Sequence, residues 1–292
     1  MKPEIAVLDL QGQFRVHTEL HRAEAAEKTI ILVNGSLATT ASFAQTVRNL
    51  HPHYNVVLFD QPYAGKSKPY NPRGTLLTKA CEARILLELI EHFGAEHVMS
   101  FSWGGASTLI ALSQRPRRVE KAVVSSFSPV INTHMRDYLE HGVVHLDSCN
   151  RAEVGNLIND HIGKFLPPLF KRFNHRHVSG LDLHEYRQMR FHVDQVMGID
   201  AHCYLKIARS IDIPVLFMNG DRDEYTTPDD ARRFTEHLND CHFRTICGAG
   251  HFLDMENKNA CRDTRQALLD FLGERPRRQR DHPRHVPQAM AV

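Results

Sequence analysis

Short apolar runs recur along the first 130 residues, and each is followed by a stretch with apolar residues at helical spacing. Thr29–Val33, Asn55–Phe59 and Lys121–Ser125 are unbroken runs of the kind that is buried on both faces of a parallel sheet. The stretch 77–93 instead places Ala, Leu, Ile and Phe residues three and four apart, which predicts an amphipathic helix. Strands alternating with helices in this way indicate βαβ units and an α/β fold with a mostly parallel sheet.

Further elements complete this pattern at both ends of the chain. Residues 4–10 and 14–20 alternate between apolar and polar positions and predict an opening antiparallel pair. A helix is predicted over 40–50, and later elements are strands at 214–218 and 242–247 with helices after 228 and over 257–272. We therefore expect helices on both faces of one sheet.

The alternation stops between residues 131 and 210, where helical segments rich in His, Arg, Met and Phe stand alone. We interpret this block as a helical cap inserted between two consecutive strands of a core formed by 1–130 and 211–273. Residues 274–292 are rich in Pro and Arg and have no periodicity, so they predict a disordered tail.

Composition restricts the functions that this fold can serve. The chain has 292 residues, of which 42% are hydrophobic and 24% are charged, as in ordinary soluble proteins. A net charge of +2 gives no electrostatic argument for nucleic-acid binding. No apolar run is long enough for a membrane span, and no signal peptide is evident, so we expect a cytoplasmic protein. The six cysteines are scattered, which predicts reduced, mostly buried thiols, and no metal site is expected.

Reactive side chains follow the predicted strands, at the edge of the sheet where α/β proteins bind their ligands. The strand Val98–Phe101 turns at Ser102 into a helix that begins with Gly104 and Gly105. This layout resembles a nucleophile elbow, whose usual pattern is Gly-x-Ser-x-Gly. Ser100 replaces the first glycine, so the motif is weak on its own.

Two later loops supply the partners that a serine nucleophile needs. Asp223 follows one strand and His251 follows the last strand, giving the order serine, acid, histidine. Asp221 and Glu224 are alternative acids, but Asp223 has the favoured Gly-x-x-Asp spacing, and Asp221 is interpreted as structural. The oxyanion hole is expected from the backbone N–H of Trp103 together with that of Ser36 or Leu37.

Longer motifs carry a family resemblance. Asn-Gly-Ser-Leu-Ala-Thr-Thr-Ala-Ser-Phe at 34–43, Phe-Ser-Trp-Gly-Gly-Ala-Ser-Thr-Leu at 101–109, Asp-Glu-Tyr-Thr-Thr at 223–227 and Gly-His-Phe-Leu-Asp-Met-Glu at 250–256 resemble the pseudomonad (R)-3-hydroxyacyl-ACP:CoA transacylases. That family links fatty-acid synthesis to polyhydroxyalkanoate formation. It has the α/β-hydrolase fold, and a near relative is the rhamnolipid-precursor synthase that esterifies two 3-hydroxyacyl chains.

The resemblance implies an acyltransferase that works through an acyl-enzyme on Ser102, with His251 as base and Asp223 as acid. Its donor would be a 3-hydroxyacyl chain on the phosphopantetheine of acyl carrier protein, its acceptor would be coenzyme A, and no cofactor would be tightly bound. Because acyl carrier proteins are acidic, basic residues of the cap are docking candidates, with a solvated helical face as the equal alternative. They are Lys164, Lys171, Arg172, Arg176, Arg187 and Arg190.

A His-x-x-x-x-Asp motif, His177 to Asp182, also matches this family and glycerolipid acyltransferases, in which the histidine is a general base. The residues themselves favour another interpretation. Asp182 followed by Glu185 is close to a capping box, which predicts a helix N-cap. We expect His177 to contact the carrier or the pantetheine arm, because one base is enough for Ser102.

Three other functions remain compatible with the same residues. One is a thioesterase that releases the free 3-hydroxy acid, and another is a synthase that joins two hydroxyacyl chains. The third is a catalytically silent binding protein, which Ser100 would favour if it distorted the elbow and misplaced Ser102.

Overall fold

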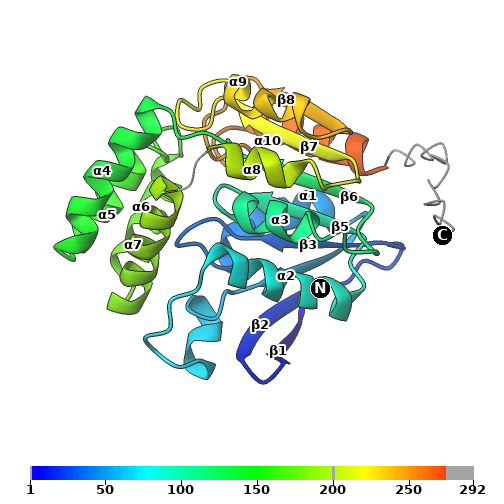
Figure 1. The fold of residues 1–292 in the computed structure, drawn as a ribbon, viewed down its shortest axis with the longest axis horizontal. Coiled ribbons are helices and arrows are strands. Elements are labelled where there is room, and N and C mark those ends of the chain that lie inside the picture. The colour runs from blue at the N-terminus through cyan, green and yellow to red at the C-terminus, as the bar shows by residue number, and fades with distance from the viewer. Residues whose placement is uncertain (1, 199–200, 274–292) are drawn as a thin grey trace, which may run out of the picture.

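The computed structural model describes residues 2–198 and 201–273, and the predicted disordered tail lies outside them. One eight-stranded sheet runs through the molecule in the order β1-β2-β4-β3-β5-β6-β7-β8 (Figure 1). Its strands are β1 Glu4–Leu10, β2 Phe14–His21, β3 Thr29–Val33, β4 Asn55–Phe59, β5 His97–Phe101, β6 Lys121–Ser125, β7 Val215–Gly220 and β8 Cys241–Ile246. The α/β class with a mostly parallel sheet is confirmed: β1, β2 and β4 pair antiparallel, and all the other pairs are parallel.

Helices cover both faces of this sheet, as the strand–helix alternation predicts. They are α1 Ala44–Leu50, α2 Lys79–Phe93, α3 Gly104–Leu112, α4 Thr133–Asp147, α5 Arg151–Asp160, α6 Pro168–Ser179, α7 Leu183–Gly198, α8 Ala201–Ala208, α9 Pro228–Ala231 and α10 Lys258–Gly273, with short 3-10 helices η1 Thr40–Phe43, η2 Gly65–Tyr70 and η3 Arg232–Glu236. The predicted helix over 40–50 therefore begins as a tighter 3-10 turn. There the Thr40 amide is tied to the Asp60 carboxylate at 2.8 Å.

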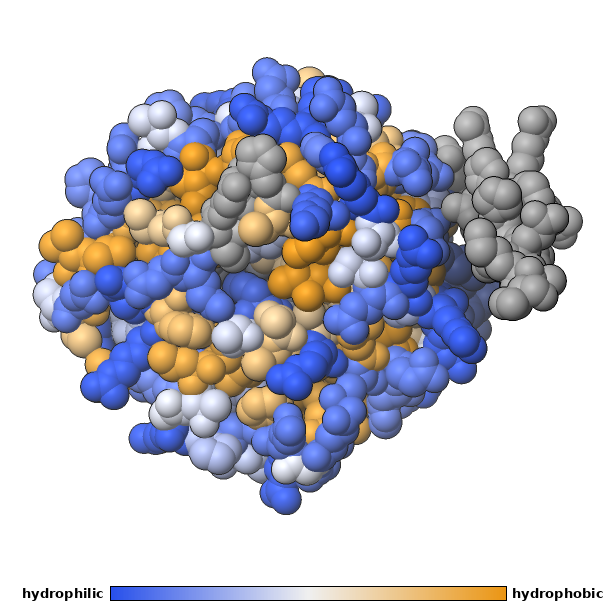
Figure 2. All heavy atoms as spheres, in the orientation of Figure 1, coloured by the Kyte–Doolittle hydropathy of each residue, from blue (hydrophilic) through white to orange (hydrophobic). Residues whose placement is uncertain are grey.

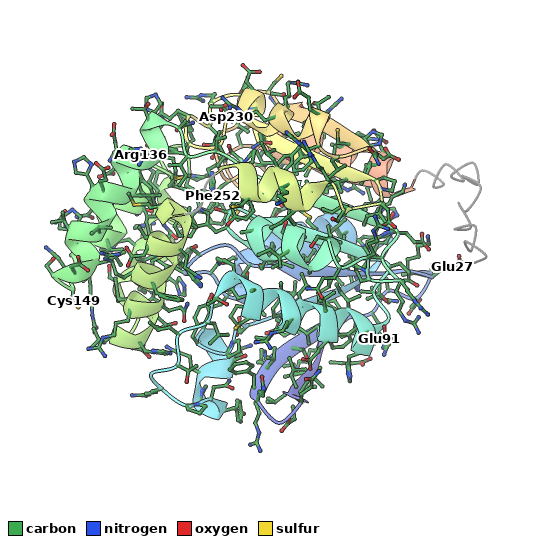
Figure 3. All side chains as sticks on the ribbon, in the orientation of Figure 1. Glu27, Glu91, Arg136, Cys149, Asp230 and Phe252 are labelled. Carbon is green, nitrogen blue, oxygen red and sulfur yellow. The ribbon has the colours of Figure 1, made fainter. Side chains whose placement is uncertain are left out.

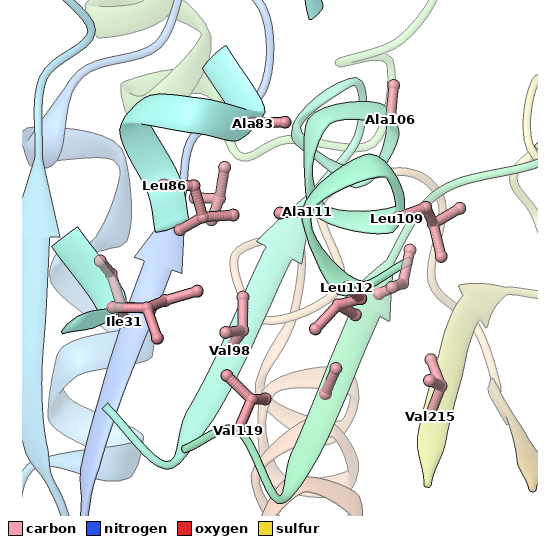
Figure 4. Close-up of a cluster of buried hydrophobic side chains, with 14 of the residues drawn as sticks. Ile31, Ala83, Leu86, Val98, Ala106, Leu109, Ala111, Leu112, Val119 and Val215 are labelled. Carbon is pink, nitrogen blue, oxygen red and sulfur yellow. The ribbon is translucent and has the colours of Figure 1, made fainter. Parts of the chain in front are cut away.

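Two apolar layers hold the helices to the sheet. On one face, side chains of α2, α3 and α8 pack over the strands, for example Leu86 over Ile31 and Val98 (Figure 4). On the other face, α1 and α10 contribute Leu50 and Leu268. Burial of a leucine or isoleucine side chain stabilises a fold by about 1.5–3 kcal/mol, so these two layers supply most of the driving force for the core.

The insertion between β6 and β7 forms its own helical layer. Helices α4 to α7 lie together at one side of the molecule (Figure 1) and share a third apolar cluster, which includes Leu139, Val154, Tyr186 and Val193. Helix α8 differs, because Tyr204 and Leu205 belong to the core cluster beside α3. We therefore propose a cap of 133–198, which is shorter than the predicted block of 131–210.

No helix among the described residues is long and apolar enough to cross a bilayer. All six cysteines are free, and none is buried, because they lie on outer helix surfaces, at an edge strand and beside chain turns. The prediction of mostly buried thiols was wrong. Apolar side chains reach the surface at several places, over the cap among them (Figure 2).

Candidate active site

The site begins with the backbone at Ser102, which has φ of 52°, in the left-handed region that an L-residue normally avoids. This conformation costs about 1–2 kcal/mol, and the surrounding chain holds it. The Ser102 amide continues the ladder beyond β5 by donating to the Ser125 carbonyl at 2.9 Å. The chain then enters α3 at once, so the hydroxyl is presented above the end of the sheet, as in a nucleophile elbow.

Close approach of β3 explains the glycine after this turn. A Cβ atom at position 104 would lie 2.5 Å from the Asn34 carbonyl oxygen, and this backbone atom could not move aside to make room. Ser100 occupies the other small-residue position, and it is fully buried in β5. It does not displace the elbow, because the Ser102 hydroxyl still reaches His251. The position of Ser102 therefore gives no support to a distorted elbow.

Three side chains from separate loops meet at the strand ends. His251 Nδ1 lies 2.7 Å from Asp223 Oδ2, and its Nε2 lies 3.0 Å from Ser102 Oγ. A carboxylate only accepts hydrogen bonds, so Nδ1 carries the proton and Nε2 presents its lone pair to the serine hydroxyl. Both His251 and Asp223 are 3% exposed. This is the geometry required of a nucleophile, a base and an orienting acid.

Asp223 is held as a carboxylate by what surrounds it. Its Oδ1 accepts from the amides of Tyr225 and Thr226, and its Oδ2 accepts from the Thr226 hydroxyl at 2.6 Å. Burial raises the pKa of the Asp223 carboxyl, but His251 and these hydrogen bonds outweigh it and hold the pKa below its ordinary value. The other two acids are engaged elsewhere: Asp221 accepts from the Gly248 amide, and Glu224 pairs with Lys164.

Several residues that position the histidine were not identified from the sequence. The Ser126 hydroxyl donates to the His251 carbonyl at 2.6 Å, and Glu256 accepts from the amides of Gly250 and Phe252. The ring of Phe252 also contacts His251; Figure 3 shows this residue where the cap meets the core. The sequence signal for Glu256 was its place at the end of the Gly-His-Phe motif.

The candidate oxyanion donors lie beside the serine. A Cβ atom at position 35 would be 3.1 Å from Ser102 Cβ, so the loop after β3 borders the nucleophile. Among the described residues, the amides of Trp103, Ser36 and Leu37 have no hydrogen-bond acceptor. Unpaired backbone N–H groups at a strand end are typical of an anion site.

His177 and Asp182, the two ends of the His-x-x-x-x-Asp motif, make separate contacts. His177 Nε2 donates to the Leu37 carbonyl at 2.7 Å, so this nitrogen carries a hydrogen. Leu37 itself has φ of 58°, a strained conformation that this contact braces. Asp182 and Glu185 exchange hydrogen bonds between side chains and amides at 3.0 Å, which confirms the capping box.

The cap reaches down onto these loops. Trp103, Leu37 and Tyr225, each from a loop of the site, pack into the apolar cluster of the cap. A small apolar cavity of about 20 Å³ lies between α4, α5 and α7, with Leu37, Met189 and Val193 in its wall. This is room for about one water molecule. A larger cavity of about 190 Å³ lies between the β1–β2 turn and α2, and none of its wall residues belongs to the site.

Comparison with known proteins assigns the family. A family model described as alpha/beta hydrolase fold matches residues 28–258. The chain belongs to the α/β-hydrolase fold family. Solved α/β structures with little sequence similarity agree on the fold: a hydrolase from Pseudomonas aeruginosa is 18% identical with a TM-score of 0.75, over 93% of this chain and 99% of that one. An enol-lactonase from Burkholderia xenovorans is 16% identical with a TM-score of 0.74, over 92% and 100%.

Much closer relatives of this α/β hydrolase share one name, (R)-3-hydroxydecanoyl-ACP:CoA transacylase. The protein from Ectopseudomonas oleovorans is 67% identical over 98% of this chain and 95% of its own length. That from Pseudomonas putida is 66% identical over 99% and 98%, and that from Pseudomonas aeruginosa is 57% identical over 99% and 96%. The resemblance seen in the sequence motifs therefore extends over nearly the whole chain.

Proposed function

We propose that this chain is an acyltransferase that moves (R)-3-hydroxyacyl groups from acyl carrier protein to coenzyme A. Its support is the shared name of relatives that are 57–67% identical over nearly the full length. The observation that carries the chemistry is the continuous hydrogen-bonded chain from Asp223 through His251 to Ser102. The cytoplasmic location expected from the sequence remains a prediction.

The first half-reaction forms an acyl-enzyme. Ser102 Oγ attacks the thioester carbonyl while His251 Nε2 takes the hydroxyl proton, and the resulting oxyanion accepts hydrogen bonds from Trp103 and from Ser36 or Leu37. When the tetrahedral intermediate collapses, the bond from carbon to sulfur breaks. The phosphopantetheine sulfur leaves as a thiol with the proton from His251, and the acyl group stays on Ser102.

The second half-reaction reverses these steps with a different thiol. Coenzyme A would give its proton to His251 and attack the Ser102 ester. The bond from the acyl carbon to Ser102 Oγ then breaks, His251 returns the proton to that oxygen, and the acyl group departs as acyl-coenzyme A. Both thiols are substrates, and no tightly bound cofactor takes part in this scheme. Asp223 stays ionised throughout and stabilises the histidine when it is charged.

Exclusion of water decides between transfer and hydrolysis, because both use the same residues. Trp103, Leu37 and Tyr225 belong at once to the site loops and to the cluster beneath the cap. We propose that this contact keeps water from the acyl-enzyme. The small apolar cavity at Met189 and Val193 would receive the acyl chain only if the cap helices move apart, since its volume is about 20 Å³.

His177 acts in this scheme as a positioning residue. Its hydrogen bond to the Leu37 carbonyl holds the strained loop whose amides face the oxyanion. Asp182 caps α7 and pairs with Lys68 at 3.1 Å, so it anchors the cap and takes no part in proton transfer.

The test is a comparison of products with and without the acceptor. The protein is incubated with 3-hydroxydecanoyl-ACP, and the products are identified by mass. Acyl-coenzyme A formed only when coenzyme A is present supports the transferase. Free acid at the same rate in both samples would instead establish a thioesterase, and an ester of two hydroxyacyl chains would establish a synthase.

A further inference from the structure

Helix α6 of the cap spans the candidate active site from one catalytic loop to another. Just before its first turn, the ring of Phe165 lies against Gly250, next to His251: a Cβ atom at 250 would be 2.5 Å from that ring. In its last turn, His177 donates to the Leu37 carbonyl. A partner bound along α6 would therefore lie beside two loops of the candidate site.

One side of α6 is occupied by α5. Asn159 of α5 donates to the Lys171 carbonyl at 2.9 Å and accepts from the Asn174 side chain at 2.8 Å. A Cβ atom at Gly155 would lie 2.8 Å from the His175 ring, so the two helices touch closely. With 3.6 residues per turn, this contact leaves the opposite side of α6 free.

The opposite side of α6 carries large apolar residues that are exposed instead of buried. Leu169, Phe170 and Phe173 are 51%, 40% and 53% exposed. Phe170, Phe173 and His177 are spaced three and four apart, so they form one stripe that leads toward the site. Burying such side chains against a partner would favour association, because apolar surface would be removed from water.

A basic stripe runs beside the apolar one. It consists of Arg172 and Arg176, which are both exposed and follow Leu169 at a spacing of three and then four residues. Neither guanidinium group forms an ion pair within residues 2–198 and 201–273. Two other basic residues of the cap are neutralised locally: Lys164 by Glu224 at 2.7 Å, and Arg190 by Asp147 at 2.8 Å. The uncompensated charge of the cap thus includes the outer side of α6.

We propose that this α6 face (Leu169, Phe170, Arg172, Phe173 and Arg176) docks the acyl carrier protein that delivers the donor thioester. The inference rests on the proposed function, in which the donor is carried by an acidic protein. Carboxylates of the carrier pair with the two arginines, and its apolar residues cover Leu169 and Phe173. The pantetheine arm then enters along the stripe that ends at His177. Complementary charge of this kind accelerates association and selects the partner.

The test reverses the charge of the face and compares two donors. Arg172→Glu/Arg176→Glu is assayed with 3-hydroxydecanoyl-ACP and with the N-acetylcysteamine thioester of the same acid, which has no protein part. We expect kcat/KM for the carrier-bound donor to fall about tenfold, mostly through KM, with no change for the small thioester. A rise of salt from low to high ionic strength should remove the difference between variant and parent.

A matched control separates this effect from net charge. Arg117→Glu/Arg118→Glu makes the same charge change in the loop before β6, at the opposite end of the sheet, where both arginines are exposed. It should leave both donors unaffected. Leu169→Ser/Phe173→Ser should weaken the carrier-bound donor without altering charge.

Four results would overturn the assignment. They are an equal loss with the small thioester, an equal loss in the Arg117/Arg118 control, a rise confined to the KM of coenzyme A, and no loss at all. If sedimentation showed that the parent protein is a dimer and the α6 variants are monomers, the face would be assigned to a second copy of the chain. If the parent transferred neither donor, the proposed function itself would fail, whatever the variants do.

Discussion

The site loops and the cap are built in contrasting ways. At the strand ends, Asp223 and His251 are almost fully buried and each is held by several hydrogen bonds, so their positions are set by the sheet. The cap has its own apolar cluster and leaves Leu169 and Phe173 half exposed. Reactivity is therefore built into the core, and under the proposed function the insertion is the part that would select donor and acceptor.

The largest expected effect lies in the core. Asp223→Asn keeps the shape of the side chain but removes the charge that selects the Nδ1–H tautomer of His251. We expect kcat to fall about 10⁴-fold, as loss of the acid does in other triads. Rapid-mixing measurement of acyl-enzyme formation checks it. A loss below about tenfold would move the acid to another carboxylate. Glu224→Gln, which changes the neighbouring carboxylate that pairs with Lys164, serves as the control.

A smaller effect is expected where the cap touches the core. His177→Ala removes the donor to the Leu37 carbonyl, and we expect kcat to fall about 10–100-fold because an oxyanion donor loses its position. His177→Gln retains an N–H donor and should recover part of the rate. If His177→Ala cost as much activity as His251→Ala, His177 would be a base, and the positioning role would be wrong.

Acid stability sharpens the comparison through one buried histidine in each region. Burial lowers the pKa of His97 in β5 and of His192 in α7 to about 4. Each histidine takes up a proton near pH 6.5 in the unfolded chain but only near pH 4 in the folded chain. Its contribution to the free energy of unfolding is therefore fully present above pH 6.5 and is lost as the pH falls toward 4. His97→Leu should therefore reduce the loss of unfolding free energy between pH 7 and pH 5 by about 2 kcal/mol.

Chemical denaturation at the two pH values measures this difference. His97 is the better probe, because neither ring nitrogen has a hydrogen-bond partner within the described chain. An unchanged pH dependence in His97→Leu would show that its pKa is not depressed. The same substitution at the other site, His192→Leu, should in addition loosen the cap, because His192 contacts the Leu77 carbonyl at 2.8 Å.

The smallest effect concerns Asp182. Asp182→Ala removes the N-cap of α7, so the free energy of unfolding should fall by about 1 kcal/mol while kcat stays within about twofold. Asp182→Asn, which can still cap the helix, should lose less stability. Measurement of denaturant midpoints and of turnover checks both. A severe loss of turnover in a folded Asp182→Asn protein would restore a catalytic role to the motif.

The sequence predicted those features that depend on local pattern. Buried strands such as Asn55–Phe59 are continuous apolar runs, and the loops with Ser102, Asp223 and His251 follow strands whose carboxyl ends share one edge of the sheet. The capping box at Asp182 and Glu185 is equally local. Spacing along the chain was sufficient in each case because secondary structure converts it into position.

Contacts between distant segments were not predictable in this way. The bond of Ser126 to the His251 carbonyl joins residues 125 positions apart, and that of His177 to Leu37 joins residues 140 apart. The sequence pattern places helix α8 in the helical block, but Tyr204 and Leu205 pack into the core. Such pairings depend on how layers meet in space, and periodicity contains no information about them.

The most direct test of the account follows the acyl group itself. The protein is mixed with 3-hydroxydecanoyl-ACP without acceptor, quenched, digested and analysed by mass, and a second sample receives coenzyme A before the quench. We predict an acyl group on Ser102 that disappears as acyl-coenzyme A forms, and no adduct in Ser102→Ala. An adduct that survives in Ser102→Ala, or one that coenzyme A does not discharge, would contradict it.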